Sequence, residues 1–319
     1  MSLRQPLRVL QGHLDQNVIG QPLLTHRMLT ALLANGHLIV EGPPGLAKTR
    51  AIKCLADGIE ADFHRIQFTP DLLPADITGG DIYRPEDGSF HFEPGPIFHN
   101  LILADEINRA PAKVQSALLE AMAERQISVG RHTYRLPELF LVMATQNPLE
   151  QEGTYPLPEA QLDRFLLHVN VDYPDADAER RILQIARAED GHESAIDVPR
   201  ISQAQLFAAR HEILDLHMSE AVEQYLVQLV LATRQPERID PELKGWIDCG
   251  ASPRATIALD RCARANAWLD DRDFVTPDDL RAMIHDVLRH RLLLSFEAEA
   301  HGIKPDDIVD RIIQAVPSA

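Results

Sequence analysis

Short apolar runs alternate with longer amphipathic segments through the first half of the chain. Five such runs occur, at residues 37–42, 62–68, 100–106, 139–146 and 165–171. Alternation of this kind is typical of a parallel sheet whose strands are joined by covering helices. The runs NLILA and LFLVMA are almost continuously apolar, which predicts strands buried on both faces. We therefore predict an α/β fold with a five-stranded parallel sheet.

Two segments between the predicted strands are rich in turn residues. The first, DLLPADITGGDIYRPEDGSFHFEPGPIF, is too long for a plain connection, and its prolines, glycines and aromatic residues predict an inserted hairpin rather than a helix, near residues 76–97. The second, ISVGRHTYRLP at residues 127–137, predicts a hairpin that turns at Gly130. It follows a predicted helix with the sequence PAKVQSALLEAMAER.

The pattern changes after residue 175. From Ala178 onward helical periodicity dominates and no strand pattern stands out. Ser252 and Thr276 each precede a proline and are favourable helix starts. The hydroxyl accepts a hydrogen bond from a backbone amide of the first turn that has no partner within the helix, and proline at the first helical position sacrifices no helical hydrogen bond. We expect an α/β core at residues 1–175, a linker helix and loop at 176–200, and an all-α lid domain at 201–319.

Composition excludes several classes of protein. The chain has 319 residues, of which 45% are hydrophobic, so it can build more than one core. No run approaches the roughly eighteen apolar residues of a membrane span, and the first residues lack the apolar stretch of a signal peptide, so we expect a cytoplasmic protein. Three widely separated cysteines favour buried thiols over disulfides or a metal site. The histidines of HEILDLH do not match the HExxH zinc pattern.

The formal net charge of the chain is −17. Such an acidic balance opposes binding to phosphate backbones, so protein partners are favoured over nucleic acid. This inference concerns the average charge only, since a ring-shaped assembly can hold a basic pore inside an acidic exterior.

The stretch EGPPGLAKTR at residues 41–50 differs by one residue from the phosphate-binding pattern GxxxxGK(S/T), because Ala47 stands at the second glycine. It lies between a predicted strand and a predicted helix, where converging amides and a cation can bind phosphates. Lys48 would reach the β- and γ-phosphates, and the Thr49 hydroxyl would bind Mg²⁺. The alternative is a proline-glycine turn before an ordinary helix. At Ala47 we predict a negative, helical φ, which accommodates a Cβ without strain.

A phosphate loop also needs a carboxylate at the end of a buried strand. The run NLILADE supplies Asp105 for Mg²⁺ and Glu106 to accept a proton from an attacking water, although a solvated strand end is the alternative. Asn147, which follows the fourth run in MATQNP, can orient the same water, or it belongs to an Asn-Pro turn. No NKxD element is present to read guanine, so adenine is the favoured base.

Taken in order, GPPGLAKT, LADEINRAP, ATQNP, QLDRF and GASPRA resemble the AAA+ ATPases, specifically the MoxR family of the helix-2-insert group. The resemblance extends from about Asn17 to the C-terminus. It implies a P-loop NTPase core that hydrolyses ATP with Mg²⁺, assembled as a ring, expected to be a hexamer. It further implies a chaperone-like motor that remodels or matures protein or metalloenzyme complexes, with a client protein and a separate von Willebrand factor A domain protein as partners.

The resemblance also implies a set of site residues. Asp105 and Glu106 match the Walker B pair, and Asn147 matches sensor 1. Arg164 in QLDRF matches an arginine finger that reaches a neighbouring subunit, and Arg254 matches sensor 2 on the lid. The stretch NVIGQ, residues 17–21, looks like the segment that contacts adenine in this family. The residues expected to contact the nucleotide are Val18, Ile19, Gly42, Pro43, Gly45, Leu46, Ala47, Lys48, Thr49 and Arg50.

Several alternatives stay open. Arg109 in EINRAP is a rival to Arg164 for the interface role, and a local ion pair with Asp163 is another explanation of Arg164. Arg254 at a helix start needs an anionic partner, because a cation there opposes the helix dipole. The aromatic residues of the first insert either contact a client or pack the insert; they are Tyr83, Phe90 and Phe92. Two other functions also fit: a DNA-remodelling, helicase-type motor, and a nucleotide-dependent scaffold with little turnover.

Overall fold

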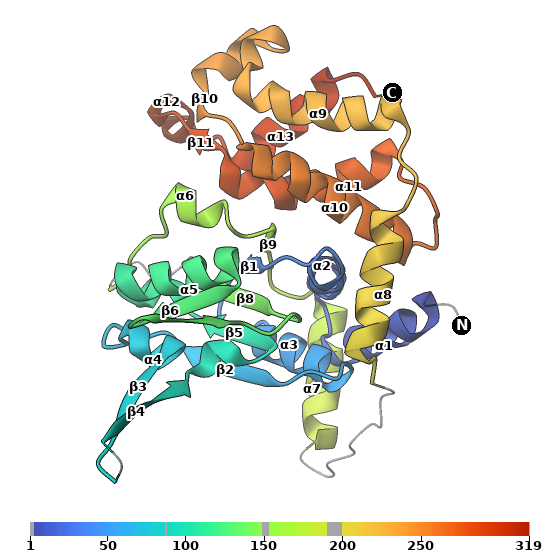
Figure 1. The fold of residues 1–319 in the computed structure, drawn as a ribbon. Coiled ribbons are helices and arrows are strands. Elements are labelled where there is room, and N and C mark those ends of the chain that lie inside the picture. Colours follow the sequence, from blue (N-terminus) through green and yellow to red (C-terminus); the bar gives the residue numbers. More distant parts are fainter. Residues whose placement is uncertain (1–2, 87, 149–152, 190–199, 319) are drawn as a thin grey trace. The chain divides into compact units, whose positions relative to one another are not determined.

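The computed structural model describes residues 3–86, 88–148, 153–189 and 200–318 (Figure 1). The chain forms two compact units. The core unit consists of Gln5–Leu157 and Val169–Leu206, and the helical unit consists of Met1–Arg4, Pro158–His168 and Phe207–Ala319.

A five-stranded sheet organises the α/β part of the fold. Its strand order is β2-β5-β8-β1-β9, and the β2–β5, β5–β8 and β8–β1 pairs are parallel. The prediction of a five-stranded parallel sheet is confirmed. The strands are β1 (Leu38–Glu41), β2 (Phe63–Gln67), β5 (Leu101–Asp105), β8 (Leu141–Gln146) and β9 (Leu167–Asn170).

The two central strands β5 and β8 are buried on both faces, as their apolar runs predict. Leu101 to Ala104 are fully buried, and Leu141 to Ala144 are at most 1% exposed. Gln67 lies opposite Asp105 in the β2–β5 register, and Glu41 lies opposite Gln146 in the β1–β8 register. Since the carboxyl ends of parallel strands meet at one edge of a sheet, the residues that follow β1, β5 and β8 lie together.

Helices accompany this sheet in the order that the alternating pattern predicts. The helix α2 is buried almost all round, from Leu24 to Leu33, and α5 buries one face. The helices are α1 (Arg4–Asn17), α2 (Pro22–Leu33), α3 (Lys48–Asp57), α4 (Pro74–Thr78), α5 (Ala112–Glu124) and α7 (Ala176–Glu189), with 3-10 turns η1 (Pro96–Phe98) and η2 (Ile107–Arg109).

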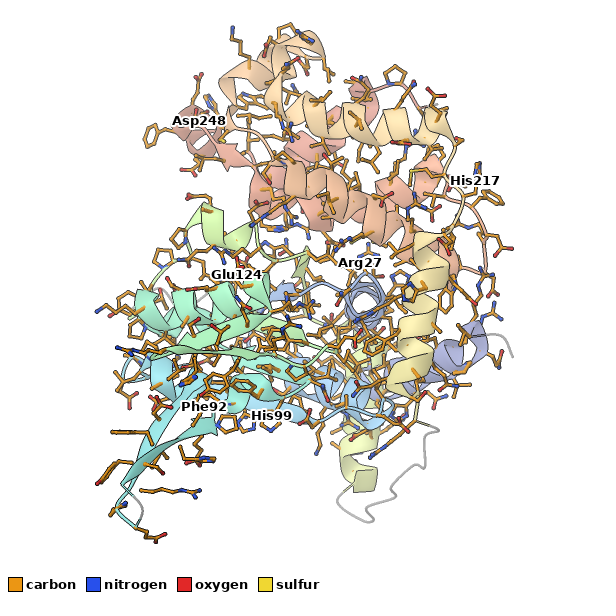
Figure 2. The ribbon with its side chains drawn as sticks, in the orientation of Figure 1. Arg27, Phe92, His99, Glu124, His217 and Asp248 are labelled. Atoms are coloured by element: carbon orange, nitrogen blue, oxygen red, sulfur yellow. The ribbon has the colours of Figure 1, made fainter. Side chains whose placement is uncertain are left out.

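Both predicted hairpins are present. The strands β3 (Gly79–Arg84) and β4 (Ser89–Pro94) form the first, which extends away from the sheet in Figure 1, and β6 (Gln126–Val129) and β7 (His132–Arg135) form the second. The first insert also contains the short helix α4, where the sequence predicts no helix. Phe92 stacks on Tyr134 of the second hairpin with ring centroids 3.8 Å apart, and its position is labelled in Figure 2. Phe92 therefore packs the insert, whereas Tyr83 and Phe90 are 53% and 70% exposed.

The helical unit holds most of the remaining elements. Ser252 caps α10 by accepting a hydrogen bond from the Arg254 amide, and Thr276 caps α11 in a capping box with Asp279, as predicted. The elements are α6 (Glu159–Leu162), α8 (Gln203–Leu214, which begins in the core unit), α9 (Glu220–Arg234), α10 (Pro253–Leu269), α11 (Pro277–Leu288), α12 (Phe296–Ala300), α13 (Pro305–Ala315), η3 (Pro236–Arg238), η4 (Pro241–Gly245), η5 (Arg289–Arg291), β10 (Ile247–Cys249) and β11 (Leu293–Leu294).

Two features of this region differ from the sequence expectations. The helical lid is confirmed, but it is not purely α-helical, because β10 and β11 form a small antiparallel ladder whose strands are too short to show an alternating pattern. The two units also do not follow the expected boundaries: residues 158–168 group with the helical unit, and α7 groups with the core unit. Among the described residues, no helix is long and apolar enough to cross a membrane.

Candidate functional site

The loop between β1 and α3 has the features of a phosphate cradle. Gly45 has a φ of +83°, and a Cβ at this position would meet no atom within 4 Å, so the backbone is open to close approach. The amides at the N-terminus of α3 face the end of the loop, where the helix dipole favours an anion. Lys48 Nζ donates a hydrogen bond of 2.7 Å to the Gly42 carbonyl. The loop thus offers backbone amides and a cation together.

The pKa of Lys48 is lowered by burial. Desolvation lowers the pKa of its ammonium group, while the nearby carboxylates of Asp105, Glu106 and Glu41 act in the opposite direction. These charges act on Lys48 because the ends of β1 and β5 lie at the same edge of the sheet. A bound phosphate would add a further anionic partner, in direct hydrogen-bond contact with this cation.

The prediction for Ala47 is wrong. Ala47 has a φ of +54° and a ψ of 19°, in the left-handed region, and it precedes α3 as the N-cap rather than lying in its first turn. The prediction assumed that the helix already included this residue. Because α3 begins at Lys48, the chain has to turn at Ala47, and the conformation is one that glycine adopts without cost.

Asp105 ends β5, and both of its carboxylate oxygens are engaged. Thr145 donates a hydrogen bond of 2.6 Å to Oδ1 from the neighbouring strand β8, and Arg65 of β2 binds Oδ2 at 2.6 Å. Carboxylate and hydroxyl oxygens are the ligands that Mg²⁺ prefers, and Thr49 adds a half-buried hydroxyl at the start of α3. The oxygen chemistry of Asp105 and Thr49 therefore fits a magnesium site.

Glu106 occupies a strained position directly after β5. Its φ of 57° and ψ of 50° lie in the left-handed region, which is costly for a residue with a side chain. Its amide donates to Thr145 Oγ1 at 2.9 Å, while its carboxylate accepts from Gln67 at 2.9 Å and pairs with Arg109 at 3.0 Å. Arg109, the rival for the interface role, is thus bound to the carboxylate of its own chain.

Asn147 follows β8 directly and is buried, with 6% of its surface exposed. The last residue of that strand, Gln146, accepts a hydrogen bond of 3.3 Å from the Gly42 amide. This bond joins the start of the phosphate loop to the strand that carries Asn147. The structure therefore brings Lys48, Thr49, Asp105, Glu106 and Asn147 to one edge of the sheet.

A cavity of about 250 Å³ lies beside the loop, within the core unit. Its wall includes Gly45, Leu46, Ala47 and Arg50, so it opens directly onto the phosphate cradle. The residue Ile19 of the predicted adenine segment also lines it, whereas Val18 is not among the lining residues and is 1% exposed. The cavity has a mainly apolar wall next to a phosphate site, which suits a planar base.

The sequence reasoning missed the opposite wall of this cavity. It is formed by Tyr173, Pro174, Glu179, Ile182, Ile185 and Ala186, which belong to α7 and the segment before it. Gln21 donates a hydrogen bond of 2.8 Å to the Asp172 carbonyl and holds this segment against the predicted adenine segment. The helical spacing of Ile182, Ile185 and Ala186 was the available signal, since α7 exposes part of an apolar face.

The two predicted arginines belong to the helical unit. Arg164 lies just after α6 and donates its amide to the Gln161 carbonyl at 3.1 Å, and Arg254 lies in the first turn of α10. Asp163 pairs with Arg254 at 3.9 Å and with Arg291 at 2.9 Å, and it also accepts a hydrogen bond of 2.9 Å from Ser252. The anionic partner that the position of Arg254 requires is therefore Asp163 in this structure.

Comparison with known proteins identifies the family. The family model described as "ATPase family associated with various cellular activities (AAA)" matches residues 37–167, and an AAA lid domain model matches residues 245–312. The chain is 46% identical to Chaperone MoxR1 of Mycobacterium tuberculosis over 300 residues, which cover 94% of this chain and 78% of that protein. The chain belongs to the MoxR family of AAA+ ATPases.

Two further comparisons agree with this assignment. Protein MoxR of Methylorubrum extorquens is 33% identical over 321 residues, covering 94% of this chain and 92% of that protein. A crystal structure of a candidate ATPase from Cytophaga hutchinsonii superimposes with a TM-score of 0.92 at 44% identity, covering 99% of this chain and 96% of that one. Membership of the MoxR family supports ATP binding with Mg²⁺ and ATP hydrolysis in general terms.

Proposed function

We propose that this MoxR-family chain is an ATP-hydrolysing ring motor that remodels or matures protein or metalloenzyme complexes. The observation that carries the proposal is the convergence of a phosphate cradle, a strand-end carboxylate pair and a buried asparagine beside a base-sized cavity. The name of the Mycobacterium tuberculosis relative, a chaperone, supports the remodelling role.

In the proposed mechanism each group of the site has one task. The amides of the loop and Lys48 bind the β- and γ-phosphates, and the cavity between Ile19 and α7 holds adenine. Thr49 and Asp105 would hold Mg²⁺, which when bound would neutralise charge on the phosphate oxygens. Together these residues would orient the substrate for hydrolysis.

The reacting water is activated at the strand ends. Glu106 accepts its proton, and Asn147 orients it by hydrogen bonding. Arg164 of a neighbouring subunit and Arg254 stabilise the negative charge that develops in transfer of the phosphoryl group. Assembly into a ring, which we expect to be a hexamer, makes hydrolysis depend on the neighbour.

The test is the Glu106→Gln variant. Turnover at saturating ATP should fall by about 10²- to 10⁴-fold, because a general base is removed, while the affinity for a fluorescent ATP analogue stays close to that of the wild type. Glu124→Gln is the matched control, since it makes the same charge change on the exposed end of α5 (Figure 2). Unchanged turnover in Glu106→Gln would show that the catalytic assignment is wrong and would favour a nucleotide-dependent scaffold.

The same variant can identify the partner proteins. A motor that binds ATP but cannot hydrolyse it should retain its client, so affinity capture of Glu106→Gln with ATP from the native cell should enrich a protein that is absent when ADP replaces ATP. The family resemblance suggests a protein with a von Willebrand factor A domain among the captured partners. Equal capture with ATP and ADP would contradict a nucleotide-driven remodelling cycle.

A further inference from the structure

Gln115 is a polar side chain that lies fully inside the core unit, on α5, with none of its surface exposed. Its amide nitrogen donates two hydrogen bonds, one of 3.2 Å to the Ile107 carbonyl and one of 3.0 Å to the Tyr155 carbonyl. These two carbonyls, at positions 107 and 155, lie 48 positions apart in the sequence. One side-chain amide therefore ties two separate loops to the same helix.

The first of these loops is the turn that carries Glu106. Ile107 directly follows Glu106 and begins the 3-10 turn η2, whose Arg109 amide donates to the Glu106 carbonyl at 2.9 Å. A left-handed glutamate persists only where the surrounding structure fixes it. Thr145 fixes the amide side of Glu106, and the bond from Gln115 fixes the residue on its other side.

The second loop leads away from Asn147 toward Arg164. The Tyr155 amide donates a short hydrogen bond of 2.6 Å to the Asn108 carbonyl, so the Tyr155 segment is bound to the η2 turn directly and also through Gln115. The Glu106 turn and the Tyr155 segment are therefore joined to each other and to α5 within the core unit.

The chemistry of Gln115 is unfavourable for a residue that only fills space. Its carbonyl oxygen Oε1 is buried and has no hydrogen-bond partner among residues 3–86, 88–148, 153–189 and 200–318. Burying a polar oxygen without a partner costs stability, and an apolar side chain of similar length would avoid that cost. The gain that offsets this cost is the pair of hydrogen bonds from Nε2.

We propose that Gln115 is a positioning residue for ATP hydrolysis, which holds the Glu106 turn and the Tyr155 segment as one rigid piece. The proposal rests on the proposed function, because it assumes that Glu106 acts on the attacking water. Gln115 does not contact the substrate in this proposal. It acts through the backbone conformation of Glu106, which its two hydrogen bonds hold in place.

The principal test is the Gln115→Met variant, which keeps the length of the side chain and removes both donors. We expect kcat to fall by about 10²-fold, the loss that a displacement of about 1 Å causes in a catalytic group, while KM for ATP and the affinity for a fluorescent ATP analogue change less than about twofold. Thr30→Val is the control, because Thr30 is also fully buried in the core unit and loses a hydrogen bond of 2.9 Å to the His26 carbonyl. It should leave kcat unchanged.

Amide hydrogen exchange without nucleotide tests the same idea independently of turnover. In Gln115→Met the amides of Arg109 and Tyr155 should exchange at least about tenfold faster than in the wild type, because their segments lose a shared anchor. The Thr30→Val variant should leave both amides unchanged. Unchanged exchange at both amides in Gln115→Met would overturn the proposal.

A second variant covers the case in which Gln115→Met does not fold. Gln115→Glu retains one donor when its carboxyl group is protonated, and burial raises the pKa of such a group. Its kcat relative to the wild type should therefore rise as the pH is lowered from about 8 to about 6. A flat ratio, or a kcat within about twofold of the wild type in Gln115→Met, would overturn the proposal. If Glu106→Gln also retains full turnover, the proposed function fails, and the exchange result alone then decides whether Gln115 joins the two loops.

Discussion

Ala47 offers a direct test of the geometry of the phosphate loop. It is a left-handed residue with a side chain, at a φ of +54°, where the phosphate-loop pattern has glycine. The left-handed conformation costs an L-residue about 1–2 kcal/mol relative to the right-handed one. Glycine does not have this cost, but it loses about 0.5–1 kcal/mol more conformational entropy on folding than alanine does. The difference between the midpoints of these two ranges predicts that Ala47→Gly raises the free energy of unfolding by about 0.75 kcal/mol.

The matched control lies one helical turn further along. Ala51 is fully buried in the interior of α3, where glycine costs about 1 kcal/mol relative to alanine. Ala51→Gly should therefore destabilise the protein, while Ala47→Gly should stabilise it. Urea denaturation followed by circular dichroism, without nucleotide, measures both values with the same baseline.

The sign of the change in the free energy of unfolding shows whether Ala47 is left-handed. If Ala47→Gly lowers the free energy of unfolding as much as Ala51→Gly does, Ala47 is right-handed in solution and belongs to the helix. The original expectation of a negative φ would then be correct and the left-handed loop wrong. A stabilised variant that still binds ATP would show that the alanine is a tolerated strain and does not impair the cradle.

Two further predictions concern the helical unit. Burial acts to raise the pKa of Asp279, but the hydrogen bonds that its carboxylate accepts outweigh this effect and lower the pKa. The donors are Arg272, the Thr276 backbone and hydroxyl, and Asn266. The ionised carboxylate therefore stabilises the fold above about pH 4, and this stabilisation is lost as the pH falls through the lowered pKa. Asp279→Asn should thus lower the free energy of unfolding by about 3 kcal/mol at pH 7 and by less at pH 3. The control, Asp278→Asn, alters an 86% exposed carboxylate and should change the free energy of unfolding little. Equal effects of Asp279→Asn at both pH values would contradict the proposed role of the ionised carboxylate. Mixing Lys48→Ala with Arg164→Ala subunits should restore ATP turnover in rings shown to contain both, while Lys48→Ala mixed with Glu106→Gln should not, and no recovery in the first mixture would refute a shared site.

The sequence predicts the sheet and its chemistry well because both depend on local patterns. A strand buried on both faces has to be continuously apolar, so NLILA and LFLVMA locate β5 and β8 directly. Strand ends in a parallel sheet meet at one edge, and this places Asp105, Glu106 and Asn147 near the phosphate loop without knowledge of any contact.

Other features depend on contacts that local patterns do not encode. The φ of Ala47 depends on the residue at which α3 begins, and a sequence pattern locates a helix end only to within about one or two residues. The apolar residues of α7 look like an ordinary amphipathic face until the fold places them across from Ile19. The strands β10 and β11 are too short to alternate visibly. Gln115 reads as an unremarkable polar residue of α5 until its two carbonyl partners are known.

The grouping of residues 158–168 with the helical unit places Arg164 and Arg254, the two arginines proposed for catalysis, in the same compact unit. Asp163 binds Arg291, a buried arginine 128 positions away in the sequence, so no local pattern could reveal the contact. The same carboxylate binds Ser252 and Arg254 at the start of α10. Arg164 is adjacent to Asp163 in the chain. One carboxylate therefore links the backbone next to Arg164 with the helix start that carries Arg254, and all of these residues belong to the same compact unit.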